Sequence, residues 1–341
     1  MQERVKYQPA KNLVRKYFEE LEKCSVEEVN DVLNKYLTKD HVWEGVFPFL
    51  DQETPDKLAE VFWKPLKKSL NFMQRRQDVF MAGEGTDGKT WVMSMGYFMG
   101  NYDKEFLNIK RTCKMQHLQY AEYLCVEGDK ITHTAMFVDL LGFMKEAGCY
   151  PLPVETGNYF IYPGPKDHNG LMFEDAPYEK AEKSFKVVDD MIQDLFSINA
   201  TMDTPVDMLR KSWNEDMIWY GPCGIGASFT IPRYQIQHQK PFRQQLKDKK
   251  GADLFAYFAE GDFVCFYSSM DVTPTGGWLG MPGGEKSGHL RGDIDIYYIK
   301  DGKISENWCF IDLPYYLNDL GLNIFERTQA IVNPKFEIQG I

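Results

Sequence analysis

The segment LNKYLTKDHVWEGV at residues 33–46 appears a second time, in diverged form, as LRKSWNEDMIWYGP at residues 209–222. The two segments align without a gap at a constant shift of 176 positions, so that Trp43 pairs with Trp219. Matching residues are spread along the whole segment and do not belong to one short motif. Such a repeat indicates that this part of the fold is built twice in one chain.

A second match extends the repeat toward the end of each copy. GDKITHTAMFVDLLGFMKEAG (128–148) aligns with DGKISENWCFIDLPYYLNDLG (301–321) at a shift of 173, which pairs Asp139 with Asp312. We assign the change in shift to the loop-like residues 83–89, where a difference in length costs little. A duplication of this extent predicts two homologous domains.

Each copy is predicted to contain helices first and strands afterwards. Helical spacing of apolar residues covers 11–24, 26–37 and 55–71 in the first copy, and 232–248 is the partner of the third helix. Residues of β-type composition mark three pairs of strands: 91–100 and 263–272, 117–126 and 289–299, and 131–139 and 304–312. This order predicts an α+β fold of two tandem cone-shaped domains. In each, helices pack on a curved antiparallel sheet around an apolar pocket.

The two copies are joined by residues 151–180, which are rich in proline and glycine and also carry aromatic residues. We therefore predict a first domain at 1–150, an extended linker at 151–180 that packs across the domains, and a second domain with a C-terminal tail at 181–341. Strand residues such as Val264 and Cys265 are apolar on both sides, so both faces of a sheet need cover. We expect the sheets to pack on each other as an intramolecular pseudo-dimer, with a further homodimer left open.

Composition and motifs argue against several classes of partner and cofactor. The net charge of −11 disfavours nucleic acid and anionic membranes, because both need a basic face. No apolar window approaches the roughly 18 residues of a membrane span, and the charged N-terminal segment lacks a signal-peptide core. The seven cysteines form no CxxC pair, which indicates reduced thiols in a cytoplasmic protein. Metal-ligand motifs and phosphate loops are missing from the sequence, so no metal and no cofactor are expected.

Segments of both copies carry the pattern of a known family. In the second copy they are WYGP (219–222), TPTGGWLGMP (273–282), HLRGDIDIYYIKDGKI (289–304) and NWCFIDLPYYLNDLG (307–321). In the first copy they are YFMGNYDKEFLNI (97–109), YAEY (120–123), GDKI (128–131) and DLLGFMKEAGCYPLP (139–153). The chain in this respect resembles the SnoaL-like polyketide cyclases of the nuclear transport factor 2-like (cystatin-like) superfamily, which also contains ketosteroid isomerase.

The resemblance implies an aspartate general acid/base at the end of the last strand, inside the pocket, and no cofactor or metal. The matching residues are Asp312 and Asp139. Family members often carry a His-Trp pair on this strand, where the second copy has Asn-Trp (307–308) and the first has Thr-Ala (134–135). A histidine relay at this place is therefore not expected, and the second copy is predicted to be the working site.

Strand alternation suggests how such an aspartate is surrounded. If residues 304–312 and 291–297 both turn one face to the pocket, Trp308 and Phe310 bury the carboxyl group of Asp312. Burial raises the pKa of a carboxyl group toward neutrality, which suits a general base that acts on a carbon acid. On this basis we expect Asp312 to be the residue that handles the proton.

Other roles are possible for these charged residues. Asp312 and Asp139 each directly precede a short helix, and aspartate is a favoured N-cap residue. Asp295, which matches Glu122 of the first copy, is a third candidate catalytic residue, although paired charges on a strand would also explain it. Arg291 could bind a substrate carboxylate or simply pair with a neighbouring acid.

The predicted substrate-binding residues are aromatic or basic side chains of the second copy: Trp219, Tyr220, His238, Trp278, His289, Arg291 and Trp308. A tryptophan can stack on a flat ring, and the glycines beside Trp278 would permit that loop to act as a lid. The alternative for each is an ordinary place in the core, on the surface or in a turn. His238 is specific to the second copy, because its counterpart in the first is Phe62.

Three functions fit these observations. The first is a cofactor-independent cyclase, isomerase or lyase that uses an aspartate on a hydrophobic or aromatic carbonyl compound, mainly in the second domain. The second is a module that binds a hydrophobic small molecule, or pairs as a pseudo-dimer, without chemistry. The third is a hydrolase or dehydratase that uses an aspartate and a water molecule.

Overall fold

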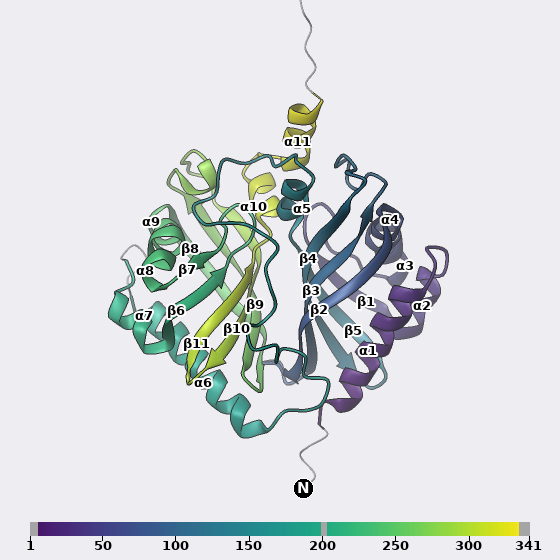
Figure 1. Cartoon of the computed structure of the whole chain (residues 1–341), viewed down its shortest axis with the longest axis horizontal. Coiled ribbons are helices and arrows are strands. Elements are labelled where there is room, and N and C mark those ends of the chain that lie inside the picture. The colour runs from purple at the N-terminus through teal and green to yellow at the C-terminus, as the bar shows by residue number, and fades with distance from the viewer. Residues whose placement is uncertain (1–5, 199–202, 334–341) are drawn as a thin grey trace, which may run out of the picture.

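The computed structural model describes residues 6–198 and 203–333, which form two β-sheets that face each other across the middle of the molecule (Figure 1). The first sheet, in the order β1-β5-β4-β3-β2, consists of β1 (Leu37–Gly45), β2 (Leu70–Glu84), β3 (Thr90–Tyr102), β4 (Met115–Glu127) and β5 (Lys130–Val138). The second, in the order β7-β6-β11-β10-β9-β8, consists of β6 (Trp213–Tyr220), β7 (Ser228–Phe229), β8 (Leu246–Glu260), β9 (Phe263–Pro274), β10 (Gly288–Lys300) and β11 (Lys303–Phe310).

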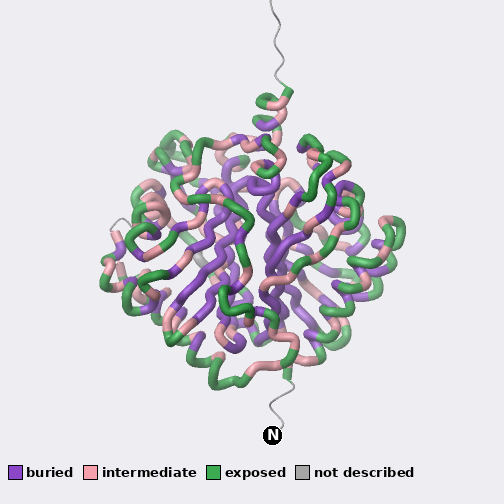
Figure 2. Tube along the Cα trace, viewed as in Figure 1, coloured by how far each residue is buried: buried purple, intermediate pink, exposed green. Residues whose placement is uncertain are grey.

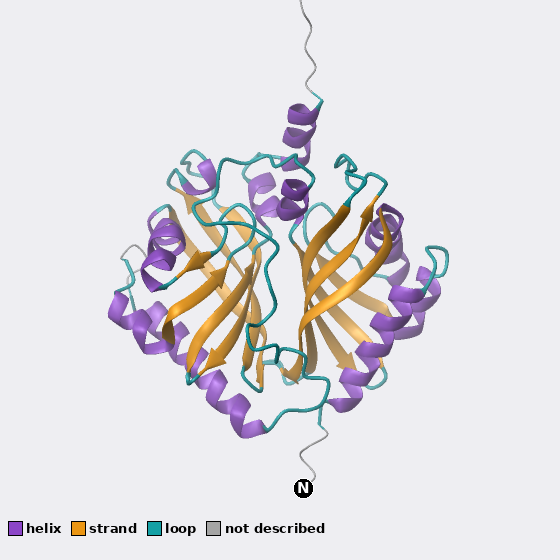
Figure 3. Cartoon of the chain, viewed as in Figure 1, coloured by secondary structure: helices purple, strands orange, loops and turns teal. Residues whose placement is uncertain are grey.

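Helices cover the outer face of each sheet (Figure 3). On the first sheet they are α1 (Gln8–Lys23), α2 (Val29–Tyr36), and a third helix made of α3 (Pro55–Leu58), a π-helical turn η2 (Ala59–Trp63) and α4 (Lys64–Ser69). On the second they are α6 (Tyr178–Ser197), α7 (Val206–Ser212), and a third helix made of α8 (Ile231–Tyr234), the π-helical turn η3 (Gln235–Gln239) and α9 (Lys240–Gln244). The shorter elements are α5 (Leu140–Glu146), η4 (Trp278–Gly280), α10 (Leu313–Asp319) and α11 (Ile324–Val332).

The two sheets repeat one strand order, with β7 added to the second. This agreement, including a π-helical turn in the third helix of both halves, confirms the predicted α+β fold with helices packed on a sheet in each half. The residue boundaries proposed for the domains stay a prediction.

The expectation of purely antiparallel sheets is wrong. β1 pairs with β5 in parallel, and β6 pairs with β11 in parallel. The sequence also failed to predict β2 and β8, because the first halves of these strands carry charged and polar residues without alternation. The predicted helices 55–71 and 232–248 end earlier in the structure, at Ser69 and Gln244. Pairing with a long neighbouring strand outweighs such weak local preference.

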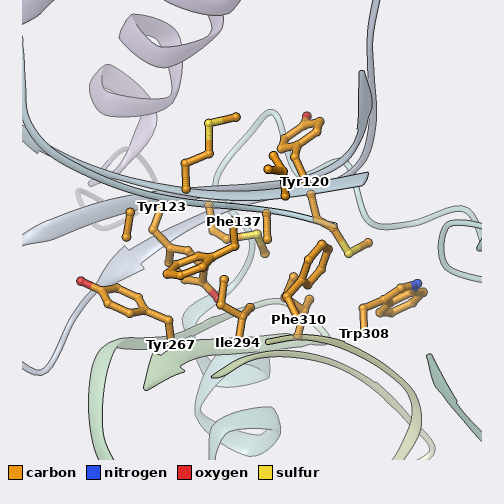
Figure 4. Packing of buried hydrophobic residues seen from close by; sticks show 14 of the residues in the cluster. Tyr120, Tyr123, Phe137, Tyr267, Ile294, Trp308 and Phe310 are labelled. Atoms are coloured by element: carbon orange, nitrogen blue, oxygen red, sulfur yellow. The ribbon is translucent and has the colours of Figure 1, made fainter. Parts of the chain in front are cut away.

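The inner faces of the two sheets pack on each other, as predicted from their apolar composition (Figure 4). The ring of Tyr267 from β9 lies among the first-domain rings of Trp91, Tyr123 and Phe137, at centroid distances of 5.3 to 6.3 Å. The Tyr123 hydroxyl donates to the Phe266 carbonyl oxygen across the interface at 3.0 Å. Buried residues accordingly follow both sheets (Figure 2). The two sheets therefore pack on each other within one chain, as predicted.

The segment between the domains packs across both of them. The backbone N–H of Tyr162 donates to the Tyr97 hydroxyl at 2.8 Å, and the Tyr162 hydroxyl donates to the Gly221 carbonyl oxygen at 2.6 Å. The Trp308 indole N–H donates to the Pro163 carbonyl oxygen at 3.2 Å. The linker is therefore bound to each sheet, as predicted.

Among the described helices, none has the length and apolar character needed to cross a membrane.

Candidate active site

A cavity of about 360 Å³ lies in the second domain, between the sheet and the helices on its outer side. The sheet contributes β10 and β11, while α6 and the α8–α9 segment form the opposite wall. Aromatic and aliphatic side chains form most of this wall, including Trp219, Phe266 and Met191. This volume and mainly apolar lining are typical of a small-molecule site.

Two carboxylates, Asp293 and Asp295, face the cavity from alternate positions of β10. The Asn307 side-chain amide donates to Asp295 at 2.9 Å, and the Cys309 thiol lies 3.7 Å from the Asp293 carboxylate. Cavity space leaves part of each aspartate accessible, while the surrounding protein encloses both carboxyl groups. Within the described lining of the cavity, these two aspartates are the acidic residues.

The protein environment gives the two carboxyl groups different pKa values. Burial raises the pKa of Asp293 to about 8, and the nearby charge of Asp295 adds to the shift. Burial also raises the pKa of Asp295, but only to about 6, because hydrogen bonds from Asn307 and Tyr297 stabilise its ionised form. The two groups titrate as a pair, because the charge of one carboxylate raises the pKa of the other. The site thus offers one base and one acid side by side.

An aromatic wall stands beside this pair. The His238 ring stacks on Trp219 with centroids 3.8 Å apart and planes 17° from parallel. Burial lowers the pKa of His238 to about 3, so the imidazole is neutral. Its Nδ1 has no hydrogen-bond partner among the described residues. A flat neutral surface of this kind suits an aromatic ligand.

A β-bulge decides which side chains reach the cavity. The β10–β11 hairpin starts with Lys300 opposite Lys303 and Ile299 opposite Ile304, and the register then shifts so that Asp295 lies opposite Cys309. Without the shift, Asp295 would lie opposite Trp308, the arrangement assumed from alternation alone. Because a one-residue slip moves a side chain to the other face, Trp308 and Phe310 point away from the cavity. Both lie between the two sheets (Figure 4).

The first domain has filled the same space with its own side chains. Glu122, the counterpart of Asp295, forms a buried ion pair with Arg75 at 2.6 Å. The Arg75 guanidinium lies against the rings of Phe18, Phe98 and Tyr120, at 3.7 to 4.8 Å from their centroids. Figure 4 shows Tyr120, the counterpart of Asp293, pointing away from the sheet interface into the first domain. The expected pocket of this domain is therefore occupied by protein.

At the position equivalent to Arg75, the second domain has no side chain that fills the pocket. In the first sheet Leu118 pairs with Phe98, which pairs with Arg75. The corresponding ladder in the second sheet runs from Leu290 through Met270 to Gly251. Gly251 has no side chain and lines the cavity. The missing side chain at this position leaves space for the cavity of the second domain.

Asp312 and Asp139 do not line the cavity, so the expectation that they lie in the pocket is wrong. Asp312 accepts a hydrogen bond from the Tyr315 backbone N–H at 3.0 Å as the N-cap of α10, and from the Phe47 N–H of the other domain at 2.9 Å. Asp139 caps α5 in the same way and accepts from the Cys223 N–H at 3.0 Å.

These two aspartates form a reciprocal bond between the domains. Phe47 and Cys223 are themselves equivalent at the shift of 176, so each copy donates to the aspartate of the other. Burial raises the pKa of Asp312 to about 7, although both of its oxygens accept backbone N–H bonds. Capping and domain docking account for the presence of an aspartate in both copies.

We expect Asp312→Asn to weaken the fold and leave turnover unchanged. Asparagine can still cap α10, but its amide nitrogen cannot accept the Phe47 N–H. Loss of that bond to a charged group lowers the free energy of unfolding by about 1.5–3 kcal/mol. Urea denaturation and a turnover assay check this. Unchanged stability together with lost turnover would restore Asp312 as the proton-handling residue.

Of the predicted substrate-binding residues, Trp219 and His238 line the cavity together with Asp295, and the others do not. Tyr220 and Trp308 stack on each other, with centroids 5.3 Å apart, at the linker side of the sheet. Trp278 is buried against Phe242 and Tyr316, so it fills space in the core.

The two basic candidates have acidic partners outside the cavity. His289 contacts Asp271 at 2.7 Å, and Arg291 forms an ion pair with Asp51 of the first domain. Placing these two residues and Tyr220, Trp278 and Trp308 in the pocket was wrong, because each contacts other residues outside the cavity.

The residues that could hold a metal ion are those of the carboxylate pair. One ligand atom from each of Asp293, Asp295 and Cys309 lies within 4.8 Å of the others. Two oxygens and one thiol form a mixed set that lacks the imidazole common in transition-metal sites. Independence from metal stays a prediction, which a turnover assay with a chelator tests.

Residues 239–320 match the model of the SnoaL-like polyketide cyclase family. The match extends from the end of η3 to the end of α10 and includes both aspartates of the pair, so the expected resemblance is confirmed for this part of the second domain. No curated protein sequence is similar enough to this chain to count as a relative.

Solved structures resemble parts of the chain at low sequence identity. A candidate SnoaL-like polyketide cyclase from Jannaschia sp. CCS1 is 16% identical over 42% of this chain and 94% of its own, with a TM-score of 0.35. TsrD from Streptomyces laurentii is 20% identical over 40% and 96%, with a TM-score of 0.33. An LEH-like epoxide hydrolase from M. tuberculosis is 12% identical over 46% and 98%, with a TM-score of 0.29.

Proposed function

We propose that the second, SnoaL-like domain is a cofactor-independent enzyme that transfers protons on a hydrophobic or aromatic carbonyl compound. The observation that carries this proposal is the pair of adjacent carboxylates that line an aromatic cavity, each with a raised pKa. A base and an acid in adjacent positions are what enolisation requires.

In the proposed mechanism Asp295 is the base and Asp293 the acid. Asp295 takes a proton from the carbon next to the substrate carbonyl, while the proton of Asp293 passes to the carbonyl oxygen. The C–H bond breaks, an O–H bond forms, and the product of this step is a neutral enol. Return of the proton to another carbon gives an isomerase, and attack of the enol carbon on a second carbonyl gives a cyclase.

The neutral wall supports this assignment. Trp219 and His238 offer a flat surface that holds a ring without adding a competing charge. Burial raises the pKa of Asp295 to about 6, so its carboxylate is a stronger base than that of an exposed aspartate.

We expect proton transfer to follow a bell-shaped pH profile. The rate should rise as pH passes about 6, where Asp295 ionises, and fall as pH passes about 8, where Asp293 loses its proton. The measurement is the loss of deuterium to water from 2-acetylnaphthalene with a deuterated methyl group. A rate that keeps rising with pH above 8, as in buffer alone, would argue against the shared proton.

A binding module without chemistry remains the alternative, because the same cavity could simply hold a ligand. The two differ in one outcome. A probe that binds in the cavity but exchanges no faster than in buffer favours the binding module.

A further inference from the structure

The opening of the cavity carries positively charged side chains, whereas its inner end carries the two aspartates. Phe196, Lys250 and Gly251 are exposed, which places the opening at α6 and the middle of β8. Lys249 and Arg243 also line this end. Three cations therefore stand at the opening of a chain whose net charge is −11.

Lys249 is the cation that matters most. Its amino group donates to the Leu246 carbonyl oxygen at 2.5 Å and lies 5.3 Å from the centre of the Phe242 ring. Among the described residues, no carboxylate contributes to the electrostatic environment of Lys249, which is set by burial and by the charge of Arg243. One carbonyl oxygen leaves N–H donors of the ammonium group for another acceptor.

The other cations at this end of the cavity have acidic residues nearby. Arg243 has Asp203 nearby, which also pairs with Lys240 at 3.1 Å. Lys250 lies across the strand pair from Asp271. Burial and the positive charge of Arg243 lower the pKa of Lys249 to about 8, so the group is still mainly protonated at neutral pH and gains from a nearby anion.

We propose that the substrate is a flat aromatic carbonyl compound that carries a carboxylate at the end remote from the reacting carbonyl, and that Lys249 binds this carboxylate. The inference rests on the proposed function and deepens it. A carboxylate at the mouth gains a charge-assisted hydrogen bond, whereas in the depth it would face the Asp293 and Asp295 pair and be repelled. The two charged ends of the cavity thus fix the direction in which the substrate enters.

The test uses two probes of the same shape, 2-acetylnaphthalene and 6-acetyl-2-naphthoate, with isothermal titration calorimetry. We expect the wild-type protein to bind the naphthoate about tenfold more tightly, as one hydrogen bond to a charged group allows. Lys249→Met keeps the length and the apolar contact with Phe242 but removes the charge. This variant should lose the preference while its Kd for the neutral ketone stays unchanged.

The control is Lys247→Met, which removes the same charge from the same strand at a position that does not line the cavity. It should keep the full preference. An equal loss in both variants, an unchanged preference in Lys249→Met, or no binding of either probe would each overturn the proposal.

The same probes separate this proposal from the proposed function. Asp295→Asn should keep the Lys249-dependent preference in binding even though it removes proton exchange. If the wild-type protein prefers the naphthoate but does not exchange its deuterium, the proposed enzymatic function is wrong and the carboxylate site at Lys249 stands. If it exchanges deuterium but shows no Lys249-dependent preference for the naphthoate, the carboxylate site is wrong and the proposed function stands.

Discussion

Replacing Asp295 with asparagine is expected to lower the rate of proton exchange by at least about a hundredfold, the usual effect of losing a general base. Asparagine has nearly the same size and can keep a hydrogen bond to Asn307, so the cavity should stay intact. The measurement is deuterium loss from the labelled ketone under single-turnover conditions, with ligand binding followed in parallel.

Asp312→Asn is the matched control for this variant, because it removes a buried carboxylate of the same domain that lies outside the cavity. Asp295→Asn should lose proton exchange and keep its stability, whereas Asp312→Asn should lose stability and keep proton exchange. Equal rates in Asp295→Asn and the wild-type protein would show that the pair does not carry the chemistry.

The second large effect is expected in the first domain. Arg75→Ala leaves Glu122 buried without its partner, and breaking a buried ion pair in this way typically costs about 3–5 kcal/mol of unfolding free energy. The neighbouring Arg76 is exposed, so Arg76→Ala should change stability by less than about 0.5 kcal/mol. Urea denaturation of the two single variants measures the difference.

The double variant Arg75→Ala/Glu122→Gln gives the reason for the loss. Removing the uncompensated charge should return part of the stability, because the cost lies in the unpaired carboxylate. If Arg75→Ala costs no more than Arg76→Ala, the first domain does not depend on this pair to fill its pocket.

Sequence alone was sufficient for the duplication and the layered α+β fold. The collinear match of 33–46 with 209–222 requires equivalent elements in both halves, and the order of the strands agrees. It was insufficient for β2 and β8, whose polar first halves are held by pairing with β3 and β9. Long-range pairing of this kind leaves little local signal.

The candidate site was predicted only in part. Trp219, His238 and Asp295 line the cavity as predicted, and their roles stay a prediction. Asp293 was not named as a candidate, and Asn307 was missed because the register shift beside Ile299 reverses the face of β11. A hairpin turn in the sequence predicts the register of its first pairs and gives no sign of a bulge further on.

Asp312 was misplaced for a different reason. An aspartate that precedes a helix looks the same in sequence whether it caps the helix, joins the domains or faces a pocket. Its second partner, the Phe47 N–H, comes from the other copy, 265 residues away in the chain. The contrast between Arg75 and Gly251 was likewise outside the aligned segments, although two equivalent positions with opposite properties could have signalled one closed and one open pocket.

The most direct test of the account is a crystal structure of the protein with 6-acetyl-2-naphthoate. We predict density for the probe in the second-domain cavity, with its rings beside Trp219 and His238 and its acetyl group next to Asp295. The carboxylate should lie at Lys249. Density in the first domain or between the sheets, or an acetyl group turned away from Asp295, would contradict the central claim that this carboxylate pair is the working site.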